Sequence, residues 1–200
     1  MRKFCFFILV LSLSLLISAC GDTAPAMYIE PAQLTQAEED IAALLGADTS
    51  TPIYDFNLDS SVQSMTINAY ALEDGQWDLF YGGGGRAFTD TKGRLALEYD
   101  TIGDGIREAV QSEHVSGSTS FKSSEPLGLP TGFHRATSKL DHRQDIVYGK
   151  EIPLAIQILT SKNEVRSFDP SYFHHPEEYE KYGYEHVFAI TVTFRQEPLS

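Results

Sequence analysis

The sequence contains only two cysteines, Cys5 and Cys20, and both lie within the first twenty of its 200 residues. A fold held together by several disulfides is therefore excluded for the rest of the chain. Basic residues are also scarce, since 15 Lys and Arg stand against 28 Asp and Glu, and the formal net charge is −13. Because phosphate binding needs clustered basic side chains, this charge argues against nucleic acid as a partner.

One long hydrophobic run is present, and it stands at the start of the chain. Arg2 and Lys3 precede an apolar stretch from Phe4 to Ile17, which two small residues end. A basic segment, an apolar core of this length and a small-residue exit are typical of a secretory signal peptide. A membrane span needs about 20 apolar residues, so a retained anchor helix is the weaker alternative. We therefore predict a signal peptide over residues 1–19.

The exit sequence Ile17-Ser18-Ala19-Cys20 resembles the lipobox of bacterial lipoproteins, whose usual pattern is Leu, Ala or Ser, Gly or Ala, and Cys. Only the first position differs, and Ile for Leu is a conservative change. The resemblance implies cleavage before Cys20, a diacylglyceryl thioether on its sulfur and attachment to membrane lipid. Two acyl chains are enough for stable anchoring. An ordinary secreted protein, cut elsewhere, is the alternative.

The rest of the chain divides into a tether and one domain. Residues 20–34 are predicted to be the lipidated amino terminus and a tether, because they lack a sustained apolar period. Residues 35–200 are predicted to form a single domain that starts with a short amphipathic helix. Thr35 and Glu38 fit a capping box at its start, and Gly46 can end it. We expect this helix to pack against the domain.

After Pro52 the apolar period changes from 3.6 to 2, which indicates strands. The expected strands are 53–58, 64–72, 77–81, 94–99, 106–111, 145–148, 151–160 and 186–194, with Asp74-Gly75 as a hairpin turn. Residues 112–134, rich in Ser, Pro and Gly, are expected to form a long surface loop. Pro153 cannot donate to a ladder, so it is expected at an edge or a bulge. The pattern predicts an all-β fold, an antiparallel β-sandwich of immunoglobulin-like or jelly-roll type with one short N-terminal helix.

Patterns that would indicate catalysis or a bound metal are incomplete. Gly82, Gly84 and Ala87 have the spacing of a dinucleotide loop, but a turn and another strand follow instead of a helix. The EF-hand-like turn that starts at Asp100 lacks two of the ligands that calcium needs. The six histidines form no zinc motif, and no G-x-S-x-G sequence is present. We therefore predict no cofactor, no metal site and no catalytic residue.

Aromatic side chains are concentrated between residues 172 and 184, where Pro176 can begin a short helix that Gly183 ends. Tyrosine offers an apolar face and a hydroxyl, which suit both sugars and peptides. The four candidates for ligand contacts are Tyr172, Tyr179, Tyr182 and Tyr184. The alternative interpretation is that these rings cover the end of the sandwich.

These features predict a membrane-anchored, extracytoplasmic lipoprotein of the cell envelope, exposed at the cell surface or on the periplasmic side. We expect its domain to be a non-enzymatic binding or envelope-associated module with a glycan or a peptide as ligand. The alternative is a surface hydrolase that cleaves glycans through a carboxylate pair, whose defining separation cannot be seen in a sequence. The sequence leaves the ligand, the membrane and the oligomeric state open.

Overall fold

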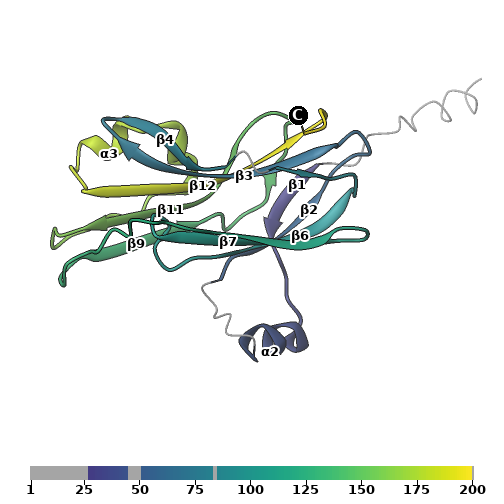
Figure 1. The fold of residues 1–200 in the computed structure, drawn as a ribbon, viewed down its shortest axis with the longest axis horizontal. Helices are drawn as coiled ribbons and strands as arrows, with labels where there is room; N and C mark the ends of the chain where they lie inside the picture. The colour runs from purple at the N-terminus through teal and green to yellow at the C-terminus, as the bar shows by residue number, and fades with distance from the viewer. Residues whose placement is uncertain (1–26, 45–50, 83–84, 200) are drawn as a thin grey trace, which may run out of the picture.

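A computed structural model describes residues 27–44, 51–82 and 85–199 of the chain, and most of them lie in two antiparallel sheets (Figure 1). Sheet A has the order β10 (Gln144–Asp145), β1 (Tyr28–Pro31), β2 (Ile53–Asn57), β6 (Lys92–Glu98), β7 (Gly105–Ser112) and β8 (Ser116–Lys122). Sheet B has the order β4 (Gln76–Tyr81), β3 (Ser64–Glu73), β12 (His186–Arg195), β11 (Ile152–Thr160) and β9 (His134–Lys139). The short strand β5 (Arg86–Ala87) also pairs with β3.

The two sheets pack face to face around one hydrophobic core. Alternate residues of β3 and β12 point into it from sheet B, and Tyr54 and Phe56 of β2 point into it from sheet A. The ring of Phe56 lies 5.3 Å from that of Phe88 and 5.5 Å from that of Phe194, between ring centroids. The hydroxyl of Tyr54 donates to the carbonyl of Leu154 across the sandwich. The structure confirms the predicted all-β, antiparallel sandwich with a short helix near its start.

Local sequence signals explain the strands that were predicted correctly. The hairpin between β3 and β4 turns at Asp74 and Gly75, whose φ angles of 47° and 76° are those of the left-handed region. Such two-residue turns match the twist of the strands that they join. The register of β11 against β12 shifts between Pro153 and Ala155, which confirms the predicted bulge or edge at that proline.

Three expectations about loops and strands are wrong. The predicted tether contains β1, which pairs with β2 and β10. The predicted loop at 112–134 contains β8, and the strand β9 was not predicted. The predicted strand at 145–148 reduces to β10. All residues of β8 except Phe121 are exposed, so no apolar alternation marks it as a strand.

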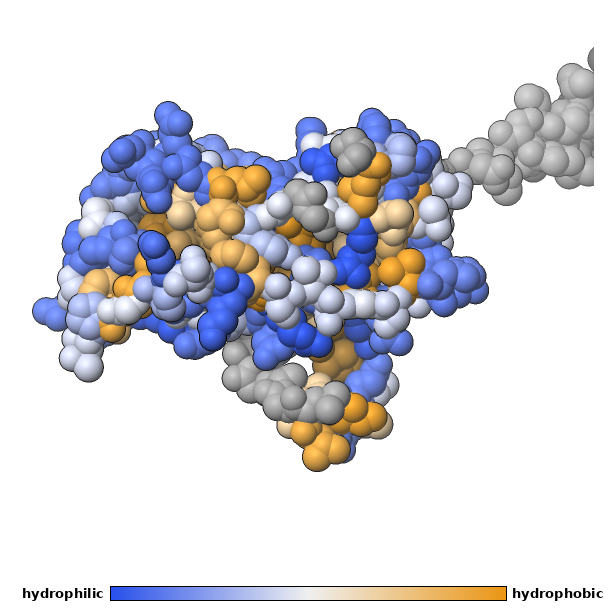
Figure 2. All heavy atoms as spheres, viewed as in Figure 1, coloured by the Kyte–Doolittle hydropathy of each residue, from blue (hydrophilic) through white to orange (hydrophobic). Residues whose placement is uncertain are grey.

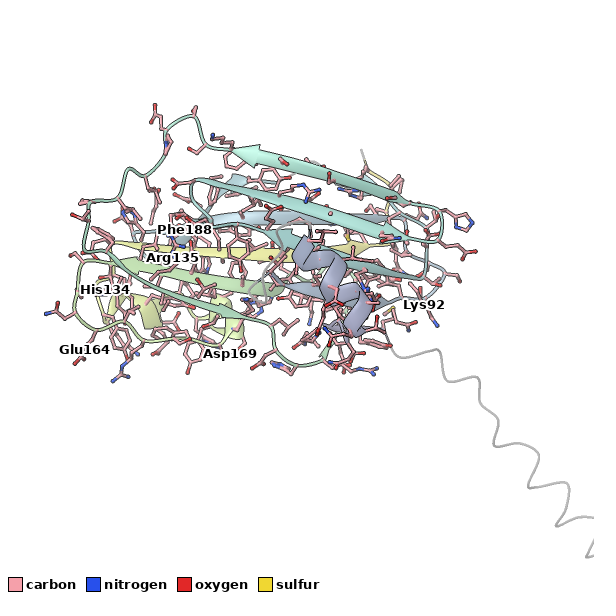
Figure 3. All side chains as sticks on the ribbon, turned by 90° about the horizontal axis from the view of Figure 1, so that it is seen from below. Lys92, His134, Arg135, Glu164, Asp169 and Phe188 are labelled. Carbon is pink, nitrogen blue, oxygen red and sulfur yellow. The ribbon has the colours of Figure 1, made fainter. Side chains whose placement is uncertain are left out.

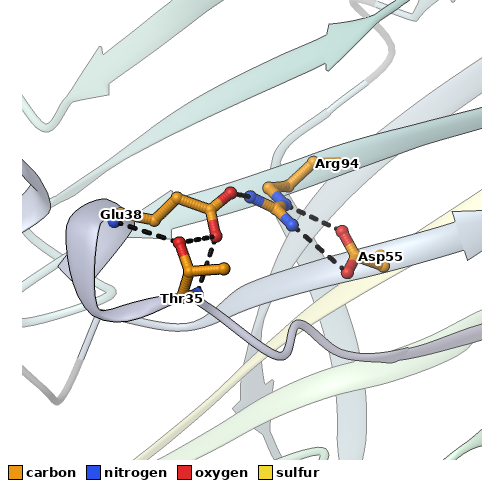
Figure 4. Close-up of polar contacts among 4 residues, drawn as sticks. All are labelled: Thr35, Glu38, Asp55 and Arg94. Carbon is orange, nitrogen blue, oxygen red and sulfur yellow. Dashed lines mark hydrogen bonds and ion pairs between the residues drawn. The ribbon is translucent and has the colours of Figure 1, made fainter.

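The helix α2 (Gln36–Leu44) begins with the predicted capping box. The carboxylate of Glu38 accepts from the backbone N–H and the hydroxyl of Thr35, and Arg94 of β6 bridges it to Asp55 with contacts of 2.8 Å to each (Figure 4). These hydrogen bonds lower the pKa of Glu38 to about 2. The predicted end of the helix at Gly46 lies outside the described residues.

The expected packing of α2 against the domain is wrong. The helix stands apart from the sandwich, and none of its residues is buried (Figure 1). Ile41 and Leu44 are 60% and 85% exposed, and apolar atoms of α2 lie on the surface (Figure 2). The polar bridge through Arg94 is thus a main connection between α2 and sheet A. The helices in the described part of the chain are too short or too polar to cross a membrane.

Candidate functional site

The aromatic segment lies over the outer face of sheet B, where it forms a third layer that we call the aromatic cover (residues 165–184; Figure 1). It contains the 3-10 helix η2 (Pro170–His174) and the helix α3 (Glu177–Glu180). A second hydrophobic cluster fills the space beneath it and includes Val187 and Ala189 of β12 and Ile156 and Ile158 of β11. Both faces of β11 and β12 are therefore buried, one in the sandwich and one under the cover.

A single tryptophan ties the cover to the sheet. Trp77 of β4 stacks on Phe173 with 5.1 Å between ring centroids and an interplanar angle of 23°. Its indole N–H donates to the carbonyl of Phe173 over 2.7 Å. At the start of η2, the carboxylate of Asp169 accepts from the backbone N–H of Ser171, which fixes the first turn. The end of η2 is thus held against β4.

The four candidate tyrosines have different environments. Tyr179 is only 1% exposed, and its buried hydroxyl has no hydrogen-bond partner among the described residues, so its prediction as a ligand contact is wrong. Burial raises the pKa of Tyr179 above its usual range. Tyr182 and Tyr184 are half-buried and stack at 5.6 Å, and their hydroxyls accept from the side chain and the backbone of Arg166.

Tyr172 is 38% exposed and is the most accessible of the four. The alternative interpretation of the segment, that its rings pack over the domain, therefore describes Tyr179 correctly. The rings cover the outer face of sheet B, however, and not the end of the sandwich. The sequence could not distinguish the two locations. The spacing of the aromatic residues is the same whether their rings cover the face of a sheet or the end of the sandwich.

A groove lies between η2 and the start of β11. A hollow of about 220 Å³ is lined on one side by Asp169, Ser171 and His174, and on the other by residues of the 140–153 segment. That second wall consists of Leu140, His142, Gln144, Glu151, Ile152 and Pro153. A larger hollow of about 630 Å³ adjoins it and shares Gln144, Glu151, Ile152 and His174. We call the two together the η2 groove; Asp169 is labelled in Figure 3.

Glu151 is held firmly in the η2 groove by side chains of sheet B. Its Oε1 accepts from the amide of Asn68 at 3.1 Å, from the hydroxyl of Tyr70 at 2.5 Å and from that of Thr191 at 2.9 Å. Burial, together with the hydrogen bond to Glu151, raises the pKa of Tyr70 to about 12. The Tyr70 hydroxyl therefore stays protonated at neutral pH and keeps donating to the carboxylate.

Three residues beside the η2 groove have the chemistry of metal ligands. Asp141, His142 and Asp169 each offer one ligand atom, and these atoms lie within 4.8 Å of one another. The Nδ1 of His142 lies 2.9 Å from a carboxylate oxygen of Asp141. All three residues are exposed, and such acidic groups are common without a bound ion. We therefore assign no metal to them.

The sequence analysis did not identify the polar residues of the η2 groove. His142, Glu151, Asp169 and His174 come from four places in the chain, and no motif connects them. Comparison of the chain with protein-family models, curated proteins and solved structures finds no match. The leader, the lipobox and Cys20 lie outside the described residues.

Proposed function

We propose that the chain is a lipid-anchored extracytoplasmic protein whose β-sandwich binds a glycan or a peptide in the η2 groove. The anchor is supported by the lipobox-like sequence that ends at Cys20. The first described strand begins at Tyr28, eight residues after Cys20. Eight residues reach at most about 28 Å when extended. In this proposal the sandwich therefore lies close to the membrane surface.

The binding proposal rests on the polar side chains that line the η2 groove. His142, Gln144, Glu151 and His174 present donors and acceptors there, and the lining also includes the apolar residues Ile152, Pro153 and Phe173. Ligand sites commonly combine an apolar wall with a few fixed polar groups that orient the ligand. Hydroxyl-rich glycans and the backbone of a peptide both suit such a wall.

A ligand screen with two neighbouring histidine variants tests this proposal. Thermal-shift assays against glycan and peptide panels should identify a ligand for the wild-type chain. His174→Ala should then weaken its binding about tenfold, because one lost hydrogen bond is worth about 1–1.5 kcal/mol. His175→Ala is the matched control, since His175 is exposed but does not line the groove. Equal effects of the two variants would place the ligand elsewhere.

A specific observation also supports the second candidate function, glycan hydrolysis. Two carboxylates, those of Glu151 and Asp169, line the same 220 Å³ hollow. Glycosidases use two carboxyl groups on opposite sides of the bond that they cleave. Asp169→Asn keeps an oxygen that can cap η2 but removes the acid, so it should abolish cleavage of a glycan panel without unfolding the cover. If the wild-type chain cleaves none of the glycans, binding without catalysis remains the proposal.

A further inference from the structure

The outermost strand of sheet A, β8, has a free edge that the rest of the described chain does not cover. It pairs with β7 alone, in an unbroken register from Gly105 opposite Lys122 to Gln111 opposite Ser116. In Figure 3, which views the molecule from below, β8 lies at the upper margin. A free edge presents unpaired N–H and C=O groups, which can pair with the strand of another chain.

Each of the other outer strands has a feature that hinders such pairing. The strands β10 and β5 are only two residues long, and β4 is distorted by a register shift where it pairs with β3. The strand β9 contains charged residues, and the hydroxyl of Ser138 contacts that of Ser167 from the loop before η2. Short length, bulges, charges and covering loops are the usual protections of sheet edges. The edge of β8 has no bulge and no charged residue before Lys122.

The sequence of β8 is complementary to itself when two copies run antiparallel about a two-fold axis at Thr119. In this register Ser118 faces Ser120 of the second copy, and Gly117 faces Phe121. An aromatic side chain opposite a glycine covers the space that the glycine leaves in a strand pair. Lys122 faces Ser116, so no like charges meet within the strand pair, although the whole chain carries a formal charge of −13.

The two faces of β8 fit this arrangement. On the inner face, the ring of Phe121 packs on the rings of Phe80 and Tyr81, with centroid distances of 5.9 and 5.2 Å respectively. These contacts hold the ring in place in the single chain, without a second copy. Thr119 accepts from Arg86 on the same face. The serines of the outer face are exposed and need no rearrangement. We infer that two copies of this chain associate through β8, joining their A sheets into one continuous antiparallel sheet.

Sedimentation velocity of paired charge variants tests the inference. The protein is the chain from residue 20 onward with Cys20→Ala, which keeps every described strand, studied at low salt so that charges are not screened. This protein, with β8 unchanged, should form dimers. Ser118→Lys/Ser120→Lys places like charges opposite each other at two symmetric positions and should raise the dissociation constant about tenfold or more. Ser118→Lys/Ser120→Glu places opposite charges there and should restore or strengthen the dimer.

Thermal melts of both double variants establish that they remain folded, and both substitute the same exposed serines. The inference is overturned if the protein with β8 unchanged stays monomeric at all concentrations. It is also overturned by a dimer that responds equally to the two double variants, because its interface would then lie elsewhere.

Cysteine cross-linking tests the register in the same background, which contains no other cysteine. Thr119→Cys places the two thiols opposite each other on the axis, so air oxidation should give a disulfide-linked dimer. Ser116→Cys is the control on the same strand, since its two thiols would lie about 20 Å apart. Efficient cross-linking of Thr119→Cys alone supports the register, and equal cross-linking of both variants overturns it.

Discussion

Tyr179 allows a test in which two substitutions at one position have opposite effects on stability. Its ring is 1% exposed, lies 4.8 Å from the ring of Phe168 between centroids, and contacts Trp77 edge-on. Its hydroxyl is buried and has no hydrogen-bond partner in the part of the chain that the structure describes. Tyr179→Ala removes the ring and leaves a cavity, whereas Tyr179→Phe removes only the unpaired hydroxyl.

The magnitudes follow from burial and hydrogen bonding. Replacing a large buried ring by alanine costs about 3–5 kcal/mol of the free energy of unfolding. We expect the lower half of that range, because the cover has only the four-residue helix α3 at this point and can partly collapse. An unpaired buried hydroxyl costs about 1–3 kcal/mol, so Tyr179→Phe should be neutral or stabilise the fold by about 1 kcal/mol.

Thermal and urea melts measure both effects. For a domain of this size, about 1 kcal/mol shifts the melting temperature by about 2–4 °C. Tyr179→Ala should therefore lower it by about 6–15 °C, and Tyr179→Phe should leave it unchanged or raise it slightly. Tyr182→Ala is the control, because its half-buried ring should cost less. A clear loss of stability in Tyr179→Phe would refute the reasoning, since the hydroxyl would then have a partner.

Three further predictions concern the anchor, the fold and its response to acid. Cys20→Ala should abolish fatty-acid labelling and membrane fractionation but leave the domain folded, and persistent labelling would contradict the lipobox. Circular dichroism of the chain from residue 20 onward should show mainly β-sheet and no change on reduction; this chain must include Tyr28–Pro31, which forms β1. Hydrogen bonds from the hydroxyl of Ser112 and the backbone of His114 lower the pKa of Asp90 to about 2 from 3.8. Because the folded pKa is the lower one, Asp90 stabilises the fold above about pH 4, and this contribution is lost as the pH falls toward 2. Urea melts between pH 7 and 2 should show a smaller loss for Asp90→Asn, and an identical loss would count against the assignment.

Local patterns in the sequence predicted the features that depend on neighbouring residues. The capping box at Thr35 and Glu38 joins groups three residues apart, and the hairpin at Asp74 and Gly75 depends on two φ angles. The long strands β3, β11 and β12 have enough apolar residues for their period to be seen. Strand β8 was missed because its exposed serines have no apolar period, although its pairing with β7 is regular.

Only the tertiary structure decided what each buried face packs against. Alternation in β12 shows that Phe188 and Ile190 share a face, but Val187 and Ala189 are buried on the other face by the aromatic cover, which precedes β12 in the sequence and folds back over it. The same limit applies to the η2 groove, where His142, Glu151 and Asp169 meet although no local pattern connects them. A sequence shows the apolar period of a segment, but which segment packs against its apolar face depends on how the chain folds back. That folding determined both the burial of Tyr179 and the lining of the η2 groove.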